Sequence, residues 1–142
     1  MKKYIVVLMC LVMGISSAQE WETSFTKTKE RALKEQKKIL LVFQGSDWCA
    51  PCIKLDRNVW STPVFKAYAQ KHFVLLKADF PKRKKNKLTK ELQEHNNKLA
   101  EKYNRNGYFP YVVVLDIDGN VLGTTSYKKM SPEDYIQLLE SF

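Results

Sequence analysis

A pair of cysteines separated by two residues constrains the fold of this chain more than any other feature of its sequence. Cys49 and Cys52 enclose Ala50 and Pro51. The apolar run at residues 39–43 comes shortly before them, and the residues that follow have the pattern of a helix. Pro51 suits the first turn of such a helix, because its missing N–H would have no intrahelical partner there. A buried strand that leads into a thiol pair at the start of a helix is the architecture of a redox site.

Hydrophobic periodicity predicts alternating helices and strands along the rest of the chain. The expected helices cover residues 21–38, 50–60, 63–71, 88–103 and 131–142, and the expected strands cover residues 39–43, 73–78, 111–115 and 121–124. This order contains two β-α-β crossovers and ends in a hairpin and a helix. It predicts an α/β fold with a central mixed β-sheet that is flanked by helices on both faces.

Residues 1–18 have the form of a signal peptide. Two lysines near the start are followed by a nearly continuous apolar run at residues 5–15 and by small residues up to Ala18. The run is shorter than the roughly 20 residues that span a bilayer. We therefore expect cleavage after Ala18, one exported domain over residues 19–142, and no stable membrane insertion once the signal is removed.

The cysteine count agrees with a single redox pair in an exported protein. Of the three cysteines, Cys10 lies in the apolar run of the signal. A lipidated Cys10 is disfavoured, because Met9 is too large for the position before a lipid-bearing cysteine. Removal of the signal leaves Cys49 and Cys52. Disulfides persist outside the cytoplasm, so we expect the pair to operate in the periplasm or another extracytoplasmic space.

The chain is basic, with a formal net charge of +9. Much of the excess lies in residues 82–87, which read Lys-Arg-Lys-Lys-Asn-Lys. Such a run can dock on an anionic membrane or an acidic partner, but a solvated loop is the interpretation that we favour. No aromatic residue lies between these cations, so the stacking platform of single-stranded nucleic acid binders is absent and we expect no nucleic-acid partner.

His72 and His95 raise the question of a metal centre shared with the two cysteines. A tetrahedral zinc site needs four converging ligands. Neither histidine lies at short ligand spacing from another, and His95 lies on the apolar stripe of its helix. We therefore interpret both as core or surface residues, and we expect neither a metal nor another cofactor.

The spacing of the two thiols gives them different roles. Cys49 precedes the helix and should carry the more exposed sulfur, and the peptide dipoles at a helix start lower the pKa of such a thiol. We expect Cys49 to be the nucleophile that attacks a substrate disulfide and forms a mixed disulfide. Cys52 lies one helical turn further on and is expected to resolve that intermediate. The products are a Cys49–Cys52 disulfide and a substrate dithiol.

The surroundings of the thiol pair point to a known family. Residues 46–52 read Ser-Asp-Trp-Cys-Ala-Pro-Cys, Pro110 opens a later apolar strand, and Asp118-Gly119 forms the turn that follows it. In these features the chain resembles the thioredoxin superfamily, specifically exported thioredoxin-like proteins with an extra helix before the third core strand. The resemblance covers residues 21–142 and implies a thioredoxin-like fold.

The resemblance implies further residues around the thiol pair. The family's proline that corresponds to Pro110 has a cis peptide bond, faces the thiols and orients the substrate backbone, so a cis Phe109–Pro110 bond is expected. Trp48 should cover one side of the disulfide and contact the substrate, with plain packing as the alternative. Phe109 and Tyr108 either add apolar contact surface or belong to the core.

Three functions fit these residues. The Ala50-Pro51 gap resembles the Gly-Pro gap of reducing thioredoxins more than the histidine-containing gaps of strong oxidants. We therefore expect a reductase or interchange enzyme that acts on disulfides in exported proteins and receives electrons from a transmembrane thiol carrier. A net oxidase or isomerase is the first alternative. The second is a peptide-binding module in which Cys49–Cys52 is a fixed staple, although so short a loop stabilises weakly.

One feature of the family is missing from the chain. Thioredoxins carry a buried acid on the strand before the motif, where it helps to move a proton to or from the second cysteine. Residues 41–44 read Leu-Val-Phe-Gln and contain no acid. Asp47, Lys54 and water are the alternatives for this proton transfer at Cys52.

Overall fold

Strands and helices alternate along the chain much as the hydrophobic pattern predicts. The computed structural model describes residues 18–142. Its strands are β1 (Trp21–Glu22), β2 (Lys38–Gln44), β3 (Phe73–Asp79), β4 (Tyr111–Leu115) and β5 (Val121–Thr125). Its helices are α1 (Phe25–Glu35), α2 (Ala50–Leu55), α3 (Pro63–His72), α4 (Lys90–Tyr103) and α5 (Pro132–Glu140). A π-helical segment, η1 (Asp56–Trp60), continues α2, and a 3-10 turn, η2 (Lys84–Asn86), follows β3.

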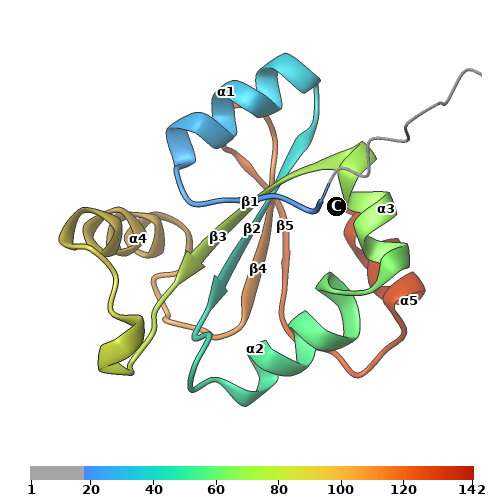
Figure 1. Cartoon of the computed structure of the whole chain (residues 1–142). Coiled ribbons are helices and arrows are strands. Elements are labelled where there is room, and N and C mark those ends of the chain that lie inside the picture. Colours follow the sequence, from blue (N-terminus) through green and yellow to red (C-terminus); the bar gives the residue numbers. More distant parts are fainter. Residues whose placement is uncertain (1–17) are drawn as a thin grey trace, which may run out of the picture.

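The strands form a mixed sheet, in the order β1-β3-β2-β4-β5 within residues 18–142. β1 and β2 run parallel to β3, whereas β4 runs antiparallel to β2 and β5 antiparallel to β4. Helices lie on both faces of the sheet (Figure 1). This arrangement confirms the predicted α/β class. Residues 1–17 of the expected signal peptide, which include Cys10, lie outside the described residues.

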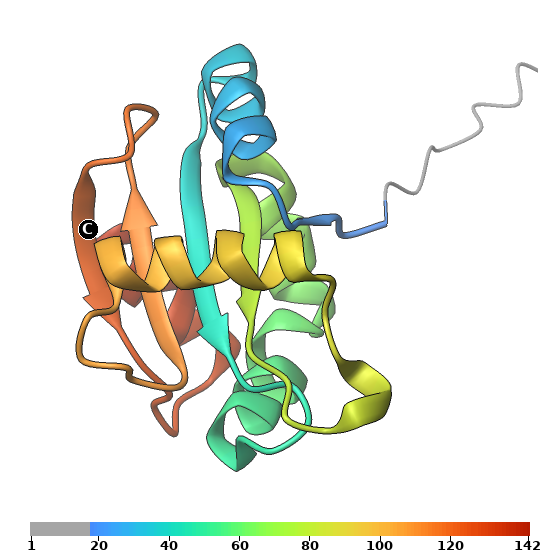
Figure 2. The same ribbon diagram turned by 90° about the vertical axis from the view of Figure 1, so that its left-hand side faces the viewer.

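β2 lies in the core because both of its faces are covered. Its side chains from Ile39 to Phe43 are all buried, as is usual for a strand with helices on either side. Leu40 and Val42 pack with apolar residues of α2, η1, α3 and α5. Ile39, Leu41 and Phe43 pack on the other face with residues of α1 and α4. Figure 2 shows α4 lying across the sheet on that face.

Two helices begin where a side-chain cap and a proline stand together. The hydroxyl of Thr62 accepts a hydrogen bond from the Phe65 N–H before α3, and that of Ser131 accepts one from the Asp134 N–H before α5. A proline occupies the first helical position in both cases. The predicted starts of these helices are confirmed. None of the helices within residues 18–142 has the length and apolar character needed to cross a bilayer.

The prediction of one helix over residues 21–38 is wrong at both ends. Trp21–Glu22 form β1, which pairs with β3. Ser24 then caps α1, which ends before residue 36. Trp21 lies four residues before Phe25 and so imitates the apolar stripe of a helix. Its ring packs instead edge-to-face against Trp60, with the centroids 6.0 Å apart.

The second predicted β-α-β crossover, from β3 through α4 to β4, does not bring in a parallel strand. Tyr111 of β4 pairs with Phe43, and Phe43 pairs with Ala78 of β3. β4 therefore starts at the end of the sheet where β3 finishes. This is possible because α4 lies across the strands rather than along them (Figure 2). The parallel crossovers are β1-α1-β2 and the connection from β2 to β3 through α2 and α3.

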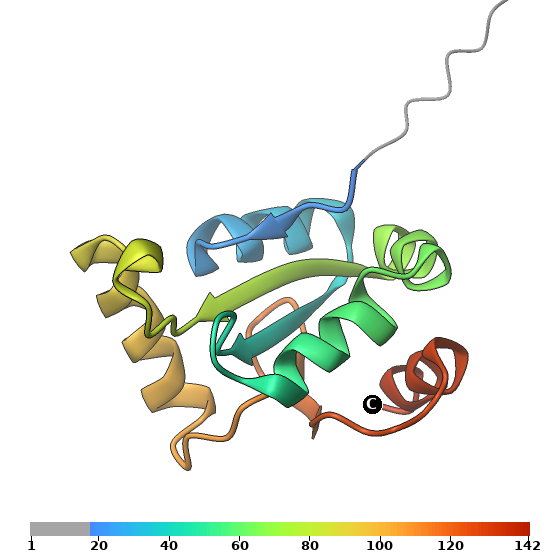
Figure 3. The same cartoon turned by 60° about the horizontal axis from the view of Figure 1, so that its bottom comes forward.

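These connections bring three chain segments to one end of the sheet. β2 leads into α2 there, β3 leads into η2, and the residues before β4 arrive at the same end. Figure 3 brings this end of the molecule forward. The thiol pair, the predicted cis proline and the basic run at residues 82–87 therefore lie in neighbouring segments.

Candidate active site

The thiol pair lies where β2 leads into α2. Cys49 is the N-cap of α2, in an extended conformation with φ of −90° and ψ of 99°. Cys49 and Cys52 form a disulfide, and their Cα atoms are 5.3 Å apart. The backbone N–H of Cys52 donates a hydrogen bond to Cys49 Sγ at 3.3 Å. Unpaired N–H groups at a helix start favour negative charge, so this position stabilises a Cys49 thiolate once the disulfide is reduced.

Both cysteines are nearly covered in the disulfide form. The exposed fractions are 4% for Cys49 and 3% for Cys52. Cys49, expected to carry the more exposed sulfur, therefore differs little from Cys52 in exposure while the disulfide ties it to a residue on the buried side of α2. The two cysteines differ instead in backbone position: Cys49 precedes the helix, and Cys52 lies within it.

Trp48, Phe80 and Phe109 form an aromatic cluster next to Cys49. Trp48 is 39% exposed, and its indole N–H donates to the Phe80 carbonyl at 2.7 Å. The Phe109 ring lies edge-to-face with both partners, at centroid distances of 5.5 Å to Trp48 and 5.4 Å to Phe80. Trp48 thus packs and also offers surface. Sequence reasoning missed Phe80, although an apolar residue between a strand end and Pro81 could have indicated it.

Gly45 makes room for the Trp48 indole. A Cβ atom at this position would overlap the Trp48 ring. The Gly45 carbonyl also accepts hydrogen bonds from the N–H groups of Trp48, at 3.3 Å, and of Cys49, at 2.9 Å. The turn between β2 and α2 therefore needs a residue without a side chain here, so that the Trp48 ring can pack against the Gly45 backbone.

The Phe109–Pro110 peptide bond is cis, as the resemblance implies. Asn104 holds the loop before it, since its side-chain amide donates to the Tyr108 carbonyl at 2.8 Å and accepts from the Tyr108 N–H at 2.9 Å. The Ser126 hydroxyl donates to the Pro110 carbonyl at 2.7 Å. Tyr108 is 56% exposed and belongs to the surface rather than to the core. A hollow of about 430 Å³ lies beside these residues.

A polar cavity of about 300 Å³ lies next to Cys52. Its lining residues are Gln44, Ser46, Cys52, Ile53, Asp56 and Lys77. Burial lowers the pKa of Lys77 below its ordinary value of 10.5, and the charges of Asp56 and Asp79 act in the opposite direction. The Lys77 ammonium also lies 4.6 Å from the centroid of the Trp21 ring. Sequence reasoning did not find this cavity, because its residues come from β2, α2, η1 and β3.

Asp47, one of the alternatives for proton transfer, holds the segment after β3. Its carboxylate accepts hydrogen bonds from the N–H of Lys82 at 2.9 Å, the N–H of Arg83 at 3.0 Å and the side-chain amide of Asn86 at 2.9 Å. These hydrogen bonds lower the pKa of Asp47 from 3.8 to about 2, and the bond from Lys82 has the largest effect. Among residues 18–142, neither Asp47 nor Lys54 lines the cavity at Cys52. An engaged carboxylate of such low pKa is a poor acceptor for a thiol proton.

The two histidines make structural contacts. His95 Nε2 accepts a hydrogen bond from the Phe25 N–H at 3.0 Å, and its Nδ1 lies 2.9 Å from Asn96 Oδ1. His72 stacks on Tyr68 with the ring centroids 4.3 Å apart. In the part of the chain that the structure describes, no group of three or more His, Cys, Asp or Glu side chains is arranged to hold a metal ion.

Thiol-disulfide oxidoreductases of the thioredoxin superfamily combine a mixed sheet of this kind with a cysteine pair at a helix start and a cis proline. A family model described as thioredoxin-like matches residues 20–116. The chain therefore belongs to the thioredoxin-like family.

Relatives of known chemistry support the same class. DsbH of Chlamydia pneumoniae, named a disulfide bond reductase, is 31% identical over 122 residues, which cover 86% of this chain and 71% of DsbH. A solved structure of a DsbH oxidoreductase has a TM-score of 0.80 and 29% identity, and the match covers 88% of this chain and 84% of that chain. A disulphide isomerase from Xylella fastidiosa Temecula1 has a TM-score of 0.61 and 26% identity, with 81% and 87% covered. The protein is a thiol-disulfide oxidoreductase.

Proposed function

We propose that the protein is a disulfide reductase of the cell envelope, with Cys49 as the nucleophile and Cys52 as the resolving thiol. The observation that carries the proposal is the N-cap position of Cys49, where the Cys52 N–H donates to its sulfur. Two facts support the reducing direction. The gap residues Ala50 and Pro51 include no histidine, and the relative DsbH is named a reductase.

The proposed reaction begins with the reduced protein. The Cys49 thiolate attacks one sulfur of a substrate disulfide, a mixed disulfide forms, and the other substrate sulfur leaves as a thiolate that takes up a proton. The Cys52 thiol then loses its proton and attacks Cys49 Sγ, which releases the second substrate sulfur. Two electrons have passed to the substrate, and the Cys49–Cys52 disulfide remains. A thiol donor must return two electrons, and we assign this role to a transmembrane thiol carrier.

The surface beside the thiol pair fits an extended substrate segment in this proposal. The exposed edge of Trp48 offers apolar contact on one side, and the hollow beside Pro110 offers room on the other. We assign Pro110 to orientation of the substrate backbone, and Phe109 to support of Trp48 through their edge-to-face contact. Ala50 and Pro51 form the first turn of α2 between the two sulfurs.

The extracytoplasmic location belongs to the same proposal. We assign residues 1–18 to a signal peptide and residues 19–142 to the exported domain. The positive start, the apolar run and the small residues before position 19 support this assignment. The substrates would then be disulfide-containing exported proteins, since stable disulfides are concentrated in that compartment.

A net isomerase or oxidase is the second candidate, because the disulphide isomerase of Xylella fastidiosa Temecula1 is 26% identical to this chain over the matched region. The reduction potential of the thiol pair separates the candidates. We expect a value near the roughly −270 mV of thioredoxin, whereas an oxidase would lie near the roughly −120 mV of a strong oxidant. Equilibration with glutathione or dithiothreitol buffers measures this value.

Insulin reduction by dithiothreitol tests whether the pair turns over at all. We expect the protein to accelerate the reaction at least about tenfold, because a thiol activated at a helix start is ionised to a far larger extent at neutral pH than a free one. Cys49→Ser should abolish this acceleration. Lys71→Ala, at an exposed position at the opposite end of the molecule, is the control and should leave it intact. Equal rates for the wild type and Cys49→Ser would favour the peptide-binding module with a fixed disulfide.

A further inference from the structure

Five cations lie on the segment between β3 and α4, which the proposed chemistry does not use. We call them the basic rim: Lys82, Arg83, Lys84, Lys85 and Lys87. All of them are exposed. Within residues 18–142, the ion pairs involve other side chains and none of these five. The rim is therefore a concentrated positive charge that the nearby carboxylate of Asp47, whose charge acts on Arg83, offsets only in part.

Asp47 fixes the backbone of the rim against the active-site turn. The Asp47 carboxylate, two residues before Cys49, accepts hydrogen bonds from the backbone N–H groups of Lys82 and Arg83 and from the side chain of Asn86. The loop is solvated, as expected, but it is not free to move away from the thiol pair. Two backbone N–H groups and the Asn86 side chain occupy the Asp47 carboxylate, while the cationic residues of the rim stay exposed.

Further contacts join the rim to the residues on either side of Asp47. The Lys82 ammonium lies 3.9 Å from the centroid of the Trp48 ring, a cation–π contact. The N–H and hydroxyl of Ser46 donate to the two carboxylate oxygens of Asp79, at 2.9 Å and 2.6 Å. The indole N–H of Trp48 donates to the carbonyl of Phe80. The turn that leads into the thiol pair and the start of the rim thus form one hydrogen-bonded unit.

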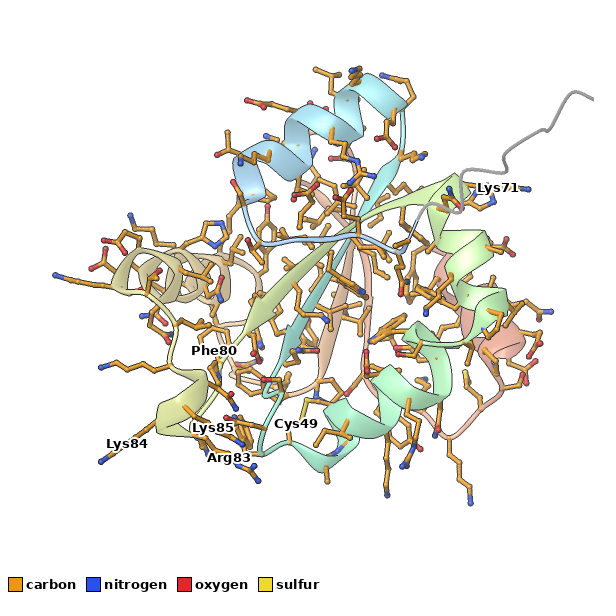
Figure 4. All side chains as sticks on the ribbon, in the orientation of Figure 1. Cys49, Lys71, Phe80, Arg83, Lys84 and Lys85 are labelled. Carbon is orange, nitrogen blue, oxygen red and sulfur yellow. A yellow bond between two sulfur atoms is a disulfide. The ribbon has the colours of Figure 1, made fainter. Side chains whose placement is uncertain are left out.

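The rim and the thiol pair lie at the same end of the molecule. Figure 4 shows Arg83, Lys84 and Lys85 at the end of the sheet where Cys49 lies, and Lys71 at the opposite end. A partner that brings a disulfide or a dithiol to Cys49 must approach this end. Carboxylates on the partner that face the rim then interact with its cations over the roughly 8 Å screening length of physiological salt.

We propose that the basic rim is a docking surface for an acidic partner protein, which carries carboxylates beside the cysteines that exchange with Cys49 and Cys52. This inference rests on the proposed function, because it names the partner of the same thiol pair. The surface near the pair favours a protein over a lipid headgroup layer: Trp48 and Ile53 expose 39% and 46% of their area, and the cations lie to one side of Cys49 (Figure 4). An apolar centre with a charged edge is the usual composition of protein–protein contacts.

The rim should act mainly on the rate of encounter. A charged surface beside a reactive site raises the association rate of an oppositely charged partner about ten- to a thousandfold, and salt removes the effect. The contribution of the rim is therefore a preference for acidic over neutral substrates that is large at low salt. It should disappear in about 1 M salt, where the screening length is about 3 Å.

Two disulfide-bonded peptides test the proposal, identical except that glutamates or serines flank the cysteines. With dithiothreitol as the reductant, we expect the full-length protein to reduce the acidic peptide about tenfold faster than the neutral one at low salt. The double variant Lys84→Glu/Lys85→Glu should lose this preference and keep its rate with the neutral peptide. The matched control Lys34→Glu/Lys71→Glu makes the same change of charge at exposed positions near the opposite end, and should retain the preference.

Equal rates for the two peptides in the wild type would overturn the proposal, and so would an equal loss of preference in the rim variant and the control. Lys84→Ala/Lys85→Ala, which only removes charge, should give an intermediate preference. This variant keeps the test possible if the double glutamate variant fails to fold. Vesicles of pure phosphatidylglycerol provide a further arm. Binding of the vesicles through the rim, without any preference between the peptides, would assign the surface to a membrane and contradict the proposal.

A binding arm separates this inference from the proposed function. The variant Cys49→Ser/Cys52→Ser cannot exchange disulfides, but its rim is intact. We expect it to bind the fluorescently labelled acidic peptide more tightly than the neutral one, with the difference lost in about 1 M salt. Failure of the wild type to reduce either peptide, with the binding preference intact, would refute the reductase and leave the docking surface standing. Reduction of both peptides without a binding preference would refute the docking surface and leave the reductase standing.

Discussion

Cys52 and Lys77 come from α2 and β3 and line the same polar cavity. Burial lowers the pKa of the Lys77 ammonium, and the charge of Asp56 opposes this effect. Lys77 and Asp56 also line a larger groove of about 890 Å³ beside β1. The two side chains therefore stand between the resolving cysteine and a second, polar hollow. We expect Lys77 to favour the thiolate of Cys52, at a site where thioredoxins rely on a buried acid.

Replacement of Lys77 by methionine tests this role. Loss of the positive charge disfavours the Cys52 thiolate, so the resolution of the mixed disulfide should slow about tenfold at neutral pH. The pH profile of this step should move to higher pH, because more base is needed to ionise the thiol. Stopped-flow measurement of the resolution step between pH 6 and 9 follows both effects. Lys77→Arg keeps the charge and should restore the profile, and an unshifted profile in Lys77→Met would refute the role.

Whether a site residue can be predicted from the sequence depends on how far along the chain its partners lie. The cysteine pair and its place before a helix follow from adjacent residues, and the cis Phe109–Pro110 bond follows from the family resemblance. Phe80 has no local motif, because its carbonyl accepts from Trp48 of another loop. Asn104 bonds to Tyr108 only four residues further on, but an asparagine in a loop is too common to single out. The position of Lys77 beside Cys52 depends on the pairing of β2 with β3, which a periodic pattern does not reveal.

Among the elements, the segment between β3 and α4 is held against the active site by hydrogen bonds. Asp47→Ala removes the acceptor of three hydrogen bonds to this segment. We expect the amide protons of residues 82 and 83 to exchange with solvent at least about tenfold faster, because local opening of the loop becomes easier. Asp118→Ala, in the turn before β5, is the matched control and should leave those amides unchanged. Unchanged exchange in Asp47→Ala would contradict the role of Asp47.

The same contact has a defined dependence on pH. The pKa of Asp47 is lowered from 3.8 to about 2 in the folded protein, so the ionised carboxylate binds the loop better than the protonated acid does. Its stabilising effect is therefore complete above about pH 4 and is lost as the pH falls through about 2. The difference in free energy of unfolding between the wild type and Asp47→Ala should be constant from pH 7 to about 4 and then shrink.

Local hydrogen bonding explains which elements the sequence predicts well. α3 and α5 begin at Pro63 and Pro132, as expected, because a hydroxyl and a proline specify a helix start within a few residues. β1 was missed because a strand of two residues has no period of its own, and its pairing is with β3, far along the chain. The direction of β4 was missed for a related reason, since the orientation of α4 on the sheet decides it.

At the scale of the whole molecule, charge and chemistry are concentrated at one end. The formal net charge of +9 follows from composition, but the placement of the basic rim beside the thiol pair does not, since it depends on the register of β2 against β3. In contrast, some of the cations near the other end are paired: Glu35 accepts from both Arg31 and Lys37. The asymmetry leaves one end of the domain suited to exchange with a partner.

Covalent trapping by the Cys52→Ser variant is the most direct test of exchange through Cys49. Incubation of this reduced variant with a disulfide substrate should accumulate a mixed disulfide, which mass spectrometry after alkylation assigns to Cys49. The Cys49→Ser variant should accumulate little under the same conditions. The absence of any mixed disulfide in Cys52→Ser, or equal trapping through Cys52 in Cys49→Ser, would contradict the assignment of the nucleophile.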